Sequence, residues 1–223
     1  MFAGHVGVAL AAKVVEPRAP LGALVAATFA LDLLWPILLV TGIESVSVAP
    51  GATAFTPLAF DSYPWSHSLA MVLGWGALGW GLMRWFGGTR GAATAVGAVV
   101  VSHWFLDFIT HDPDLPLWPR GPEVGLGLWN SVPGTLAVEG AIFLGAIILY
   151  LRAFPARDWK GRVAFGSLVG FVALIWVSGP FSPPPPSATA VAVVGFALWV
   201  FPFWGWWVER GREPAGVKGG LKG

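Results

Sequence analysis

Residues 91–112 read GAATAVGAVVVSHWFLDFITHD, and they join a long apolar run to four ionisable side chains. The part 91–110 is long enough to cross a bilayer, because a transmembrane helix needs about 20 mainly apolar residues. Near its end, His103, Asp107 and His111 follow one another at spacings of four, which places them roughly on one face of a helix. Ionisable groups at membrane depth are costly and usually mark a functional site. The stretch therefore predicts a membrane helix whose His/Asp pair is suited to binding a metal.

The composition of the whole chain indicates a membrane protein. Of the 223 residues, 56% are hydrophobic and 11% are charged, and the mean hydropathy is +0.70, whereas a soluble domain is roughly 25% charged. The formal net charge of +1 gives no reason to expect a nucleic-acid partner. The chain has no cysteine, so any metal must be held by His, Asp, Glu or backbone oxygen.

The apolar segments predict an all-α, polytopic membrane helical bundle with about six full spans plus a short N-terminal helix. The short segment is 2–15, and a signal peptide is its alternative reading, although the basic region that precedes a signal core is missing. The full spans are expected at 21–42, 65–87, 91–110, 131–154, 163–181 and 188–208. Residues 1–208 would form one transmembrane domain. Residues 209–223 would form a basic cytoplasmic tail that we expect to be disordered.

The basic residues predict the orientation of these spans. Twelve of the 13 Lys and Arg residues lie in alternate connections and in the tail. They are Lys13, Arg18, Arg84, Arg90, Arg152, Arg157, Lys160, Arg162, Arg210, Arg212, Lys218 and Lys222. The opposite connections hold only Arg120. The positive-inside rule then places the C-terminus in the cytoplasm and the loops at 43–64, 111–130 and 182–187 outside.

This orientation gathers the ionisable groups of the spans in the outer half of the membrane. All four histidines fall there, and so do the three carboxylates that lie within predicted spans. They are His5, His67, His103, His111, Asp32, Asp107 and Glu139. The convergence follows from topology alone.

A divalent metal, most readily zinc, would account for such a cluster, because zinc binds imidazole and carboxylate ligands. The predicted metal ligands are His5, Asp32, His67, His103 and Asp107. Glu139 could orient a ligand or act as a general base, and His111 is a second candidate for proton transfer.

Each of these residues also has a structural interpretation. An intramembrane His, Asp or Glu can simply bond a neighbouring helix. Asp32 precedes Trp35-Pro36 and could satisfy backbone that the proline frees, and Ser66 could cap the helix that begins near His67. His111 could be a solvated loop residue.

Several short blocks, taken in order, resemble the YdjM-like inner-membrane family, whose members are described as metal-dependent hydrolases. The blocks are Gly4-His5, Leu31-Asp32, Ser66-His67-Ser68-Leu69, Ser102-His103-x-x-Leu106-Asp107 and Pro116-Leu117-Trp118-Pro119. The resemblance runs from the N-terminus to about Glu139. It implies a multi-pass protein of the bacterial inner membrane whose His and Asp residues bind metal.

The chain departs from the family pattern at two places. The family often has Asp-x-Asp-His where residues 32–35 read DLLW, and His-Arg-Gly-x-Thr-His-Ser where residues 61–68 read DSYPWSHS. These departures argue against a site for two metals. The chain is most similar to a divergent subgroup marked by THDPDLPL at 110–117 and GLGLWNS at 125–131.

The leading hypothesis is a membrane-embedded, metal-dependent hydrolase that acts on an amphipathic ester, such as a lipid or a lipid-linked phosphate, among the surrounding membrane lipids. One alternative is an ion- or proton-coupled transporter, although no internal repeat of the kind common in transporters is found. The other is a structural membrane protein whose polar cluster only fixes helix packing. Metal content, ester turnover and cation flux would separate the three.

Overall fold

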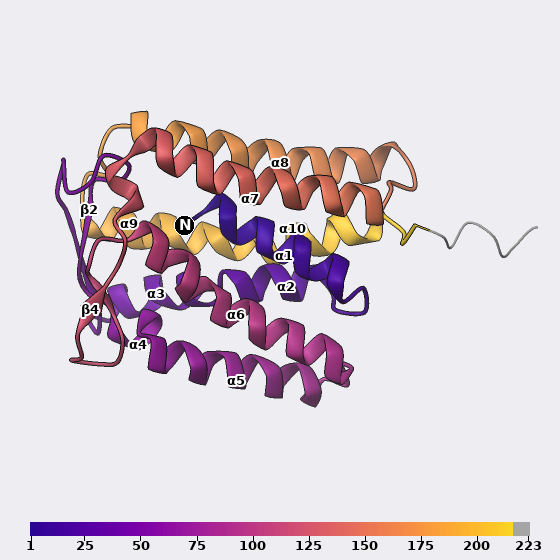
Figure 1. Ribbon diagram of the computed structural model, residues 1–223, viewed down its shortest axis with the longest axis horizontal. Helices are drawn as coiled ribbons and strands as arrows, with labels where there is room; N and C mark the ends of the chain where they lie inside the picture. The colour runs from indigo at the N-terminus through magenta and orange to yellow at the C-terminus, as the bar shows by residue number, and fades with distance from the viewer. Residues whose placement is uncertain (216–223) are drawn as a thin grey trace, which may run out of the picture.

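The computed structural model describes residues 1–215, and 67% of the protein is helical. The helices run side by side along the long axis of the molecule, and the strands gather at one end (Figure 1). The helices are α1 (Ala3–Val15), α2 (Leu21–Thr28), α3 (Ala30–Val40), α4 (Pro64–His67), α5 (Leu69–Trp85), α6 (Arg90–Thr110), α7 (Val132–Ala153), α8 (Trp159–Ser178), α9 (Ala188–Gly195) and α10 (Val200–Arg210).

Two short hairpins close the end of the bundle where α6 finishes. Strand β1 (Ser45–Val48) pairs antiparallel with β2 (Leu58–Ser62), and β3 (Leu115–Pro116) pairs antiparallel with β4 (Glu123–Val124). Single 3₁₀ turns occupy Leu128–Asn130, Gly179–Phe181 and Phe196–Trp199. The predicted long loops at 43–64 and 111–130 are therefore compact hairpins that cover one end of the helices.

The number of candidate membrane spans is smaller than predicted. By length and composition, four helical stretches within residues 1–215 can cross a bilayer: Arg90–Thr110, Val132–Ala153, Trp159–Phe181 and Ala188–Arg210. Helices α2 and α3 add a fifth if the pair, bent by 50°, is one broken span. The count of about six is not confirmed, because extended Ser68 splits the expected span 65–87 and leaves α5 with 17 residues.

Helix α1 is too short to span but lies at the centre of the bundle. It packs against α7, α2 and α6, and most of its side chains are buried. Gly7 permits this packing, since a Cβ there would lie 3.2 Å from the Cα of Phe143 on α7. Small residues commonly mediate such close helix contacts in membranes.

The break between α2 and α3 determines where Asp32 lies. The chain bends at Phe29, which has φ −100° and ψ 8°, and α3 restarts at Ala30. Asp32 therefore occupies the first turn of a new helix, where the helix dipole favours a negative charge. A continuous span would have left this carboxylate without that stabilisation.

The described residues after α9 form the C-terminal end of the bundle. Helix α10 continues to Arg210, and Arg212 forms a bridge to Ala156 and donates to the carbonyl oxygen of Phe154 at 2.6 Å. Residues 209–215 thus pack onto the connection between α7 and α8 and belong to the folded domain. The remainder of the predicted tail, 216–223, lies outside the described residues.

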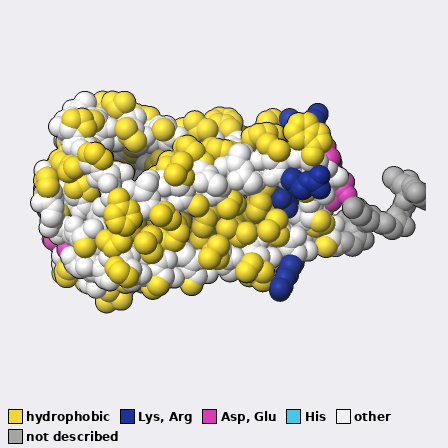
Figure 2. Space-filling view, turned by 90° about the horizontal axis from the view of Figure 1, so that it is seen from above, with side chains coloured by type: hydrophobic (Ala, Val, Ile, Leu, Met, Phe, Trp, Pro, Cys, Tyr) yellow, Lys and Arg dark blue, Asp and Glu magenta, His cyan; other side chains and the backbone are white. Residues whose placement is uncertain are grey.

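The surface separates charged and apolar side chains. In Figure 2, hydrophobic side chains cover the flank of the molecule, and the visible Lys and Arg side chains gather at the end opposite the strands. This distribution is typical of a membrane protein. The side of the membrane that each end faces stays a prediction.

Candidate metal centre

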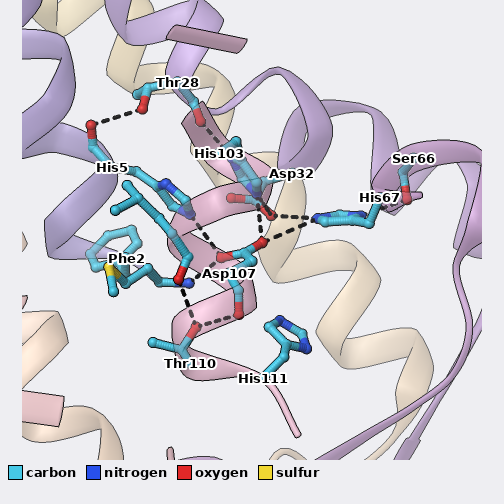
Figure 3. Close-up of polar contacts among 12 residues, drawn as sticks. Phe2, His5, Thr28, Asp32, Ser66, His67, His103, Asp107, Thr110 and His111 are labelled. Carbon is cyan, nitrogen blue, oxygen red and sulfur yellow. Dashed lines mark hydrogen bonds and ion pairs between the residues drawn. The ribbon is translucent and has the colours of Figure 1, made fainter. Parts of the chain in front are cut away.

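The structure brings all five predicted metal ligands together. His5 comes from α1, Asp32 from α3, His67 from α4, and His103 and Asp107 from α6 (Figure 3). They form two overlapping groups that share His103, one with His5 and Asp107 and one with Asp32 and His67. Within each group the candidate ligand atoms all lie within 4.8 Å of one another. The cluster can therefore hold a metal ion.

Asp107 is the hub of the cluster. Its Oδ2 lies 2.9 Å from Nε2 of His103 and 4.0 Å from Nε2 of His67. Its Oδ1 accepts a hydrogen bond from the α-amino group of Met1 at 2.5 Å and lies 3.2 Å from Nε2 of His5. Oδ1 thus contacts Met1 and His5 at the N-terminal end of the chain, while Oδ2 faces His67 and His103.

Asp32 approaches the same two histidines from the opposite side. Its Oδ1 lies 3.5 Å from Nε2 of His67 and 3.8 Å from Nε2 of His103. In the alternative interpretation, Asp32 bonds backbone groups that Pro36 leaves unpaired. The Asp32 side chain instead faces the two histidines. Asp32 is also 25% exposed, whereas the other four side chains are at most 6% exposed. The cluster opens toward the surroundings at Asp32.

The hydrogen bonds of His103 leave one ring nitrogen for a cation. Its Nδ1 lies 2.7 Å from the carbonyl oxygen of Thr28, and because a carbonyl only accepts, Nδ1 carries the proton. Nε2 makes no hydrogen bond of regular geometry in the described part of the chain, and its contact with Asp107 Oδ2 at 2.9 Å is an ion-pair contact. In the neutral ring, Nε2 presents a lone pair to oxygens of Asp32 and Asp107. That arrangement is repulsive unless a proton or a metal ion lies between them.

His67 is oriented in the same sense by a chain that leads to Glu44. Ser66 Oγ donates to Glu44 Oε2 at 2.6 Å and lies 2.7 Å from Nδ1 of His67. Since a hydroxyl has one proton, Ser66 accepts from Nδ1, and Nε2 of His67 is left free. Glu44 Oε1 also accepts from the backbone N–H groups of Trp65 and Ser66, each at 2.8 Å. Carboxylates that orient metal-binding imidazoles in this way are common.

Two of these supporting groups were missed by the sequence analysis. Glu44 follows an apolar segment, and its distance from His67 in the sequence matches no regular spacing that would predict a contact. The carbonyl of Thr28 is a backbone group that any residue could supply. Ser66 was considered as a helix cap, but Ser68 caps α5 by accepting from the N–H of Met71 at 3.4 Å. Thr28 has a second role, because its Oγ1 donates to the carbonyl oxygen of His5 at 2.8 Å.

The geometry and charge of the cluster fit a divalent ion. A tetrahedral zinc site with bonds of about 2.0 Å has ligand atoms about 3.3 Å apart. The four separations between an imidazole Nε2 of His67 or His103 and a carboxylate oxygen of Asp32 or Asp107 run from 2.9 to 4.0 Å. The two carboxylates carry a formal charge of −2 with neutral imidazoles, and the α-amino group of Met1 compensates only one of these charges. Buried charges are stable only when they are compensated in this way.

His5 lies at the edge of this four-residue set. Its ring stacks on that of His103, with 3.8 Å between centroids and 12° between planes. Its Nε2 faces the Asp107 oxygen that also accepts from Met1, and its Nδ1 has no hydrogen-bond partner in the described residues. The position suits either a ligand or a group that orients Asp107.

The two predicted proton-transfer residues lie beside the cluster, outside both groups of candidate ligands. Glu139 Oε2 accepts from the backbone N–H groups of Phe2 at 3.0 Å and Gly4 at 3.3 Å, so it satisfies donors at the start of α1. Its Oε1 has no hydrogen-bond partner in the part of the chain that the structure describes.

His111 follows the last residue of α6 and so leaves the helical face that carries His103 and Asp107. Its Nδ1 lies 3.2 Å from the hydroxyl of Tyr63 and 3.0 Å from Asp114 Oδ1. Burial and the nearby Asp114 raise the pKa of Tyr63 well above its usual value, so the hydroxyl stays protonated and donates to Asp114. Figure 3 shows the imidazole at the margin of the cluster.

Removing the hydroxyl of Ser66 is expected to weaken metal binding through His67. In Ser66→Ala, Nδ1 of His67 loses its partner, and changes to such supporting groups cost about 10- to 100-fold in metal affinity. Titration against a competing chelator would measure the change. Ser102→Ala is the matched control, because the Ser102 hydroxyl on α6 bonds the carbonyl of Val99 and not the cluster. Equal losses in both variants would contradict the assigned role.

The fold and the cluster together define a multi-pass helical membrane protein with a buried His/Asp centre that could hold a metal. The family model described as YdjM inner membrane protein matches residues 63–183, more than half of the chain. The chain therefore belongs to the YdjM inner membrane protein family, as the sequence blocks predicted. The matched region contains His67, His103 and Asp107, while His5 and Asp32 precede it. Searches of curated proteins and of solved structures found no significant match.

Proposed function

We propose that this protein is a membrane-embedded, metal-dependent hydrolase that acts on a lipid or lipid-linked phosphate ester from the outer side of the membrane. One observation carries the proposal: His103 and His67 each engage Nδ1 in a supporting hydrogen bond and direct Nε2 at the carboxylates of Asp32 and Asp107. A metal ion would satisfy both Nε2 atoms and both carboxylates at once, whereas a purely structural cluster would need protons on the imidazoles to do so.

Asp32, His67, His103 and Asp107 would hold the ion, with His5 as a further ligand or as a support for Asp107. When bound, a divalent metal such as zinc polarises an ester or phosphoryl oxygen and makes water a stronger nucleophile near neutral pH. The protein contributes fixed ligands and an apolar surrounding that excludes bulk water. The partial exposure of Asp32 makes its side the entry for substrate.

The depth of the cluster favours an amphipathic substrate. His103 lies seven residues before the last residue of α6, which corresponds to about 10 Å below the end of the helix that is predicted to face outward. A water-soluble ester would have to leave water to reach that position. A lipid already places its ester groups near the membrane interface.

Glu139 and His111 remain the candidates for proton transfer, and Glu139 can be tested apart from its structural role. Glu139→Gln keeps a side-chain oxygen for the N–H groups of Phe2 and Gly4 but cannot transfer a proton. A general base contributes typically 10²- to 10⁴-fold to the rate, so turnover should fall by that range while the melting temperature is retained. Glu139→Ala should in addition lose about 0.5–2 kcal/mol of stability, as lost helix caps do. Unchanged turnover in Glu139→Gln would show that Glu139 only caps α1.

The activity itself is tested with purified protein reconstituted in lipid and loaded with zinc, manganese or iron. Phospholipids and lipid-linked phosphates are offered, and released phosphate or fatty acid is measured. We expect release that depends on metal and disappears in Asp32→Asn. Bound metal without turnover of any lipid ester would reject the hydrolase, and cation flux in the same liposomes would support a transporter instead.

A further inference from the structure

An apolar groove lies between the broken helix pair α2–α3 and the hairpin of α5 and α6. Its volume is about 650 Å³, and every residue that lines it is apolar. Helices α2 and α3 contribute a row of alanines, Ala23, Ala26, Ala27 and Ala30, at the spacing that places residues on one helix face. These short side chains create the hollow.

The groove opens on the flank of the bundle. Its floor includes Val96 and Val100 of α6, which are 7% and 2% exposed. Its rim includes Leu78, Leu82 and Phe86, which are 50%, 48% and 81% exposed. This flank carries the apolar side chains that would face lipid. The groove is therefore a recess in the membrane-facing surface rather than a sealed cavity.

One end of the groove reaches the candidate metal centre. Val96 and Val100 share a helix face with His103 on α6, whereas the groove residues of α3 lie on the face opposite Asp32. The groove therefore approaches the cluster along α6. From Val96 to His103 the helix rises about 10 Å, so the groove extends from the cluster toward the end of the bundle that carries the basic residues.

We propose that this groove holds an acyl chain of a membrane lipid whose headgroup ester lies toward the cluster, at the end of the groove where Val100 precedes His103 on α6. The proposal rests on the function proposed above and specifies its substrate class as an acyl-chain amphiphile. An all-apolar lining offers nothing to ordered water, which needs polar partners. A helix of another protein is too wide, because even 10 Å of helix occupies roughly 800 Å³. A flexible hydrocarbon chain fits the volume, the lining and the lateral opening.

The test uses phosphatidylglycerol that carries a photoreactive diazirine midway along one acyl chain, in nanodiscs with the full-length protein. Labelled residues are mapped by mass spectrometry. We expect labelling of the groove residues on α5 and α6 to exceed that of the exposed residues of α7 and α8 by at least fivefold. Labelling that simply follows exposure on all helices would overturn the proposal.

A variant whose groove is filled by a larger side chain can be compared with the same substitution outside the groove. Ala26→Trp should lower groove labelling at least fivefold, whereas Ala141→Trp, the same change at an exposed position on α7, should leave it unchanged. If Ala26→Trp does not fold, Gly79→Leu replaces it. A Cβ at Gly79 would lie 3.4 Å from Val96 and 3.6 Å from Val100, which is ordinary contact. Labelling that persists in a folded, groove-filled variant would also overturn the proposal.

The design separates this proposal from the hydrolase. Labelling requires neither metal nor turnover, and the metal content of each sample is measured in parallel. Groove labelling in protein that binds metal but releases no product from any lipid ester would uphold the acyl-chain site and reject the metal-dependent hydrolase. Metal-loaded protein that hydrolyses a lipid ester without groove labelling would uphold the hydrolase and reject the acyl-chain site.

Discussion

Replacing His103 with alanine is expected to abolish tight metal binding. His103 belongs to both groups of candidate ligands, and its Nε2 lies 2.9 Å from Asp107 and 3.8 Å from Asp32. Loss of a ligand should weaken the affinity by more than the roughly 10- to 100-fold effect of losing a supporting group. Elemental analysis after purification and chelator competition would both report the loss.

His111→Ala is the matched control for this variant. It removes the same side chain from the margin of the cluster, where the imidazole contacts Tyr63 and Asp114 rather than the candidate ligands. We expect it to retain its metal. Equal metal content in His103→Ala and the wild type would show that the cluster is not the binding site.

Neutralising Asp32 is expected to cost more stability with metal than without it. In the metal-free protein, the Asp32 carboxylate is favoured by the start of α3 and by its contacts with His67 and His103, so Asp32→Asn should lower the melting temperature modestly. With metal, the wild type gains about 2.7 kcal/mol when free metal is 100 times its dissociation constant. Asp32→Asn loses a ligand and most of that gain, so the difference from the wild type should then be larger.

The measurement is thermal unfolding in detergent at one pH, with zinc and with a chelator. Asp61→Asn is the control, because Asp61 bonds Ser47 in the exposed β1–β2 hairpin. It should alter neither melting temperature. A destabilisation by Asp32→Asn that has the same size in both conditions would indicate a purely structural carboxylate.

The prediction was most accurate where hydropathy and topology decide the structure. The spans predicted at 91–110 and 131–154 are α6 (Arg90–Thr110) and α7 (Val132–Ala153). The five predicted ligands come from four different helices, and positive-inside reasoning alone placed them at one depth. Their convergence follows from the topology, and the topology could be predicted from the distribution of basic residues.

The breaks in the helices could not be predicted in the same way. The bend at Phe29 lies within a continuous apolar run, and nothing in the hydropathy distinguishes it from an unbroken span. Extended Ser68 similarly divides what reads as one segment. Both breaks serve the cluster, because one places Asp32 at a helix start and the other separates His67 from α5. Tertiary contacts stabilise these breaks, and local sequence does not specify such contacts.

The supporting groups were hidden for a different reason. The carbonyl of Thr28 orients His103, and Glu44 orients His67 through Ser66. A backbone carbonyl has no side-chain signature, and Glu44 is far from His67 in sequence. The role of Glu139 as an acceptor for the start of α1 also depends on the central position of α1, which its short length did not predict.

The measurement that tests the central claim most directly is the metal content of the purified wild-type protein, combined with X-ray absorption at the edge of any metal found. The account predicts close to one equivalent of a divalent metal, most readily zinc, bound by nitrogen and oxygen with at least two imidazoles. It also predicts that a chelator lowers the melting temperature. Metal-free protein whose melting temperature is unaffected by both chelator and added zinc would contradict it.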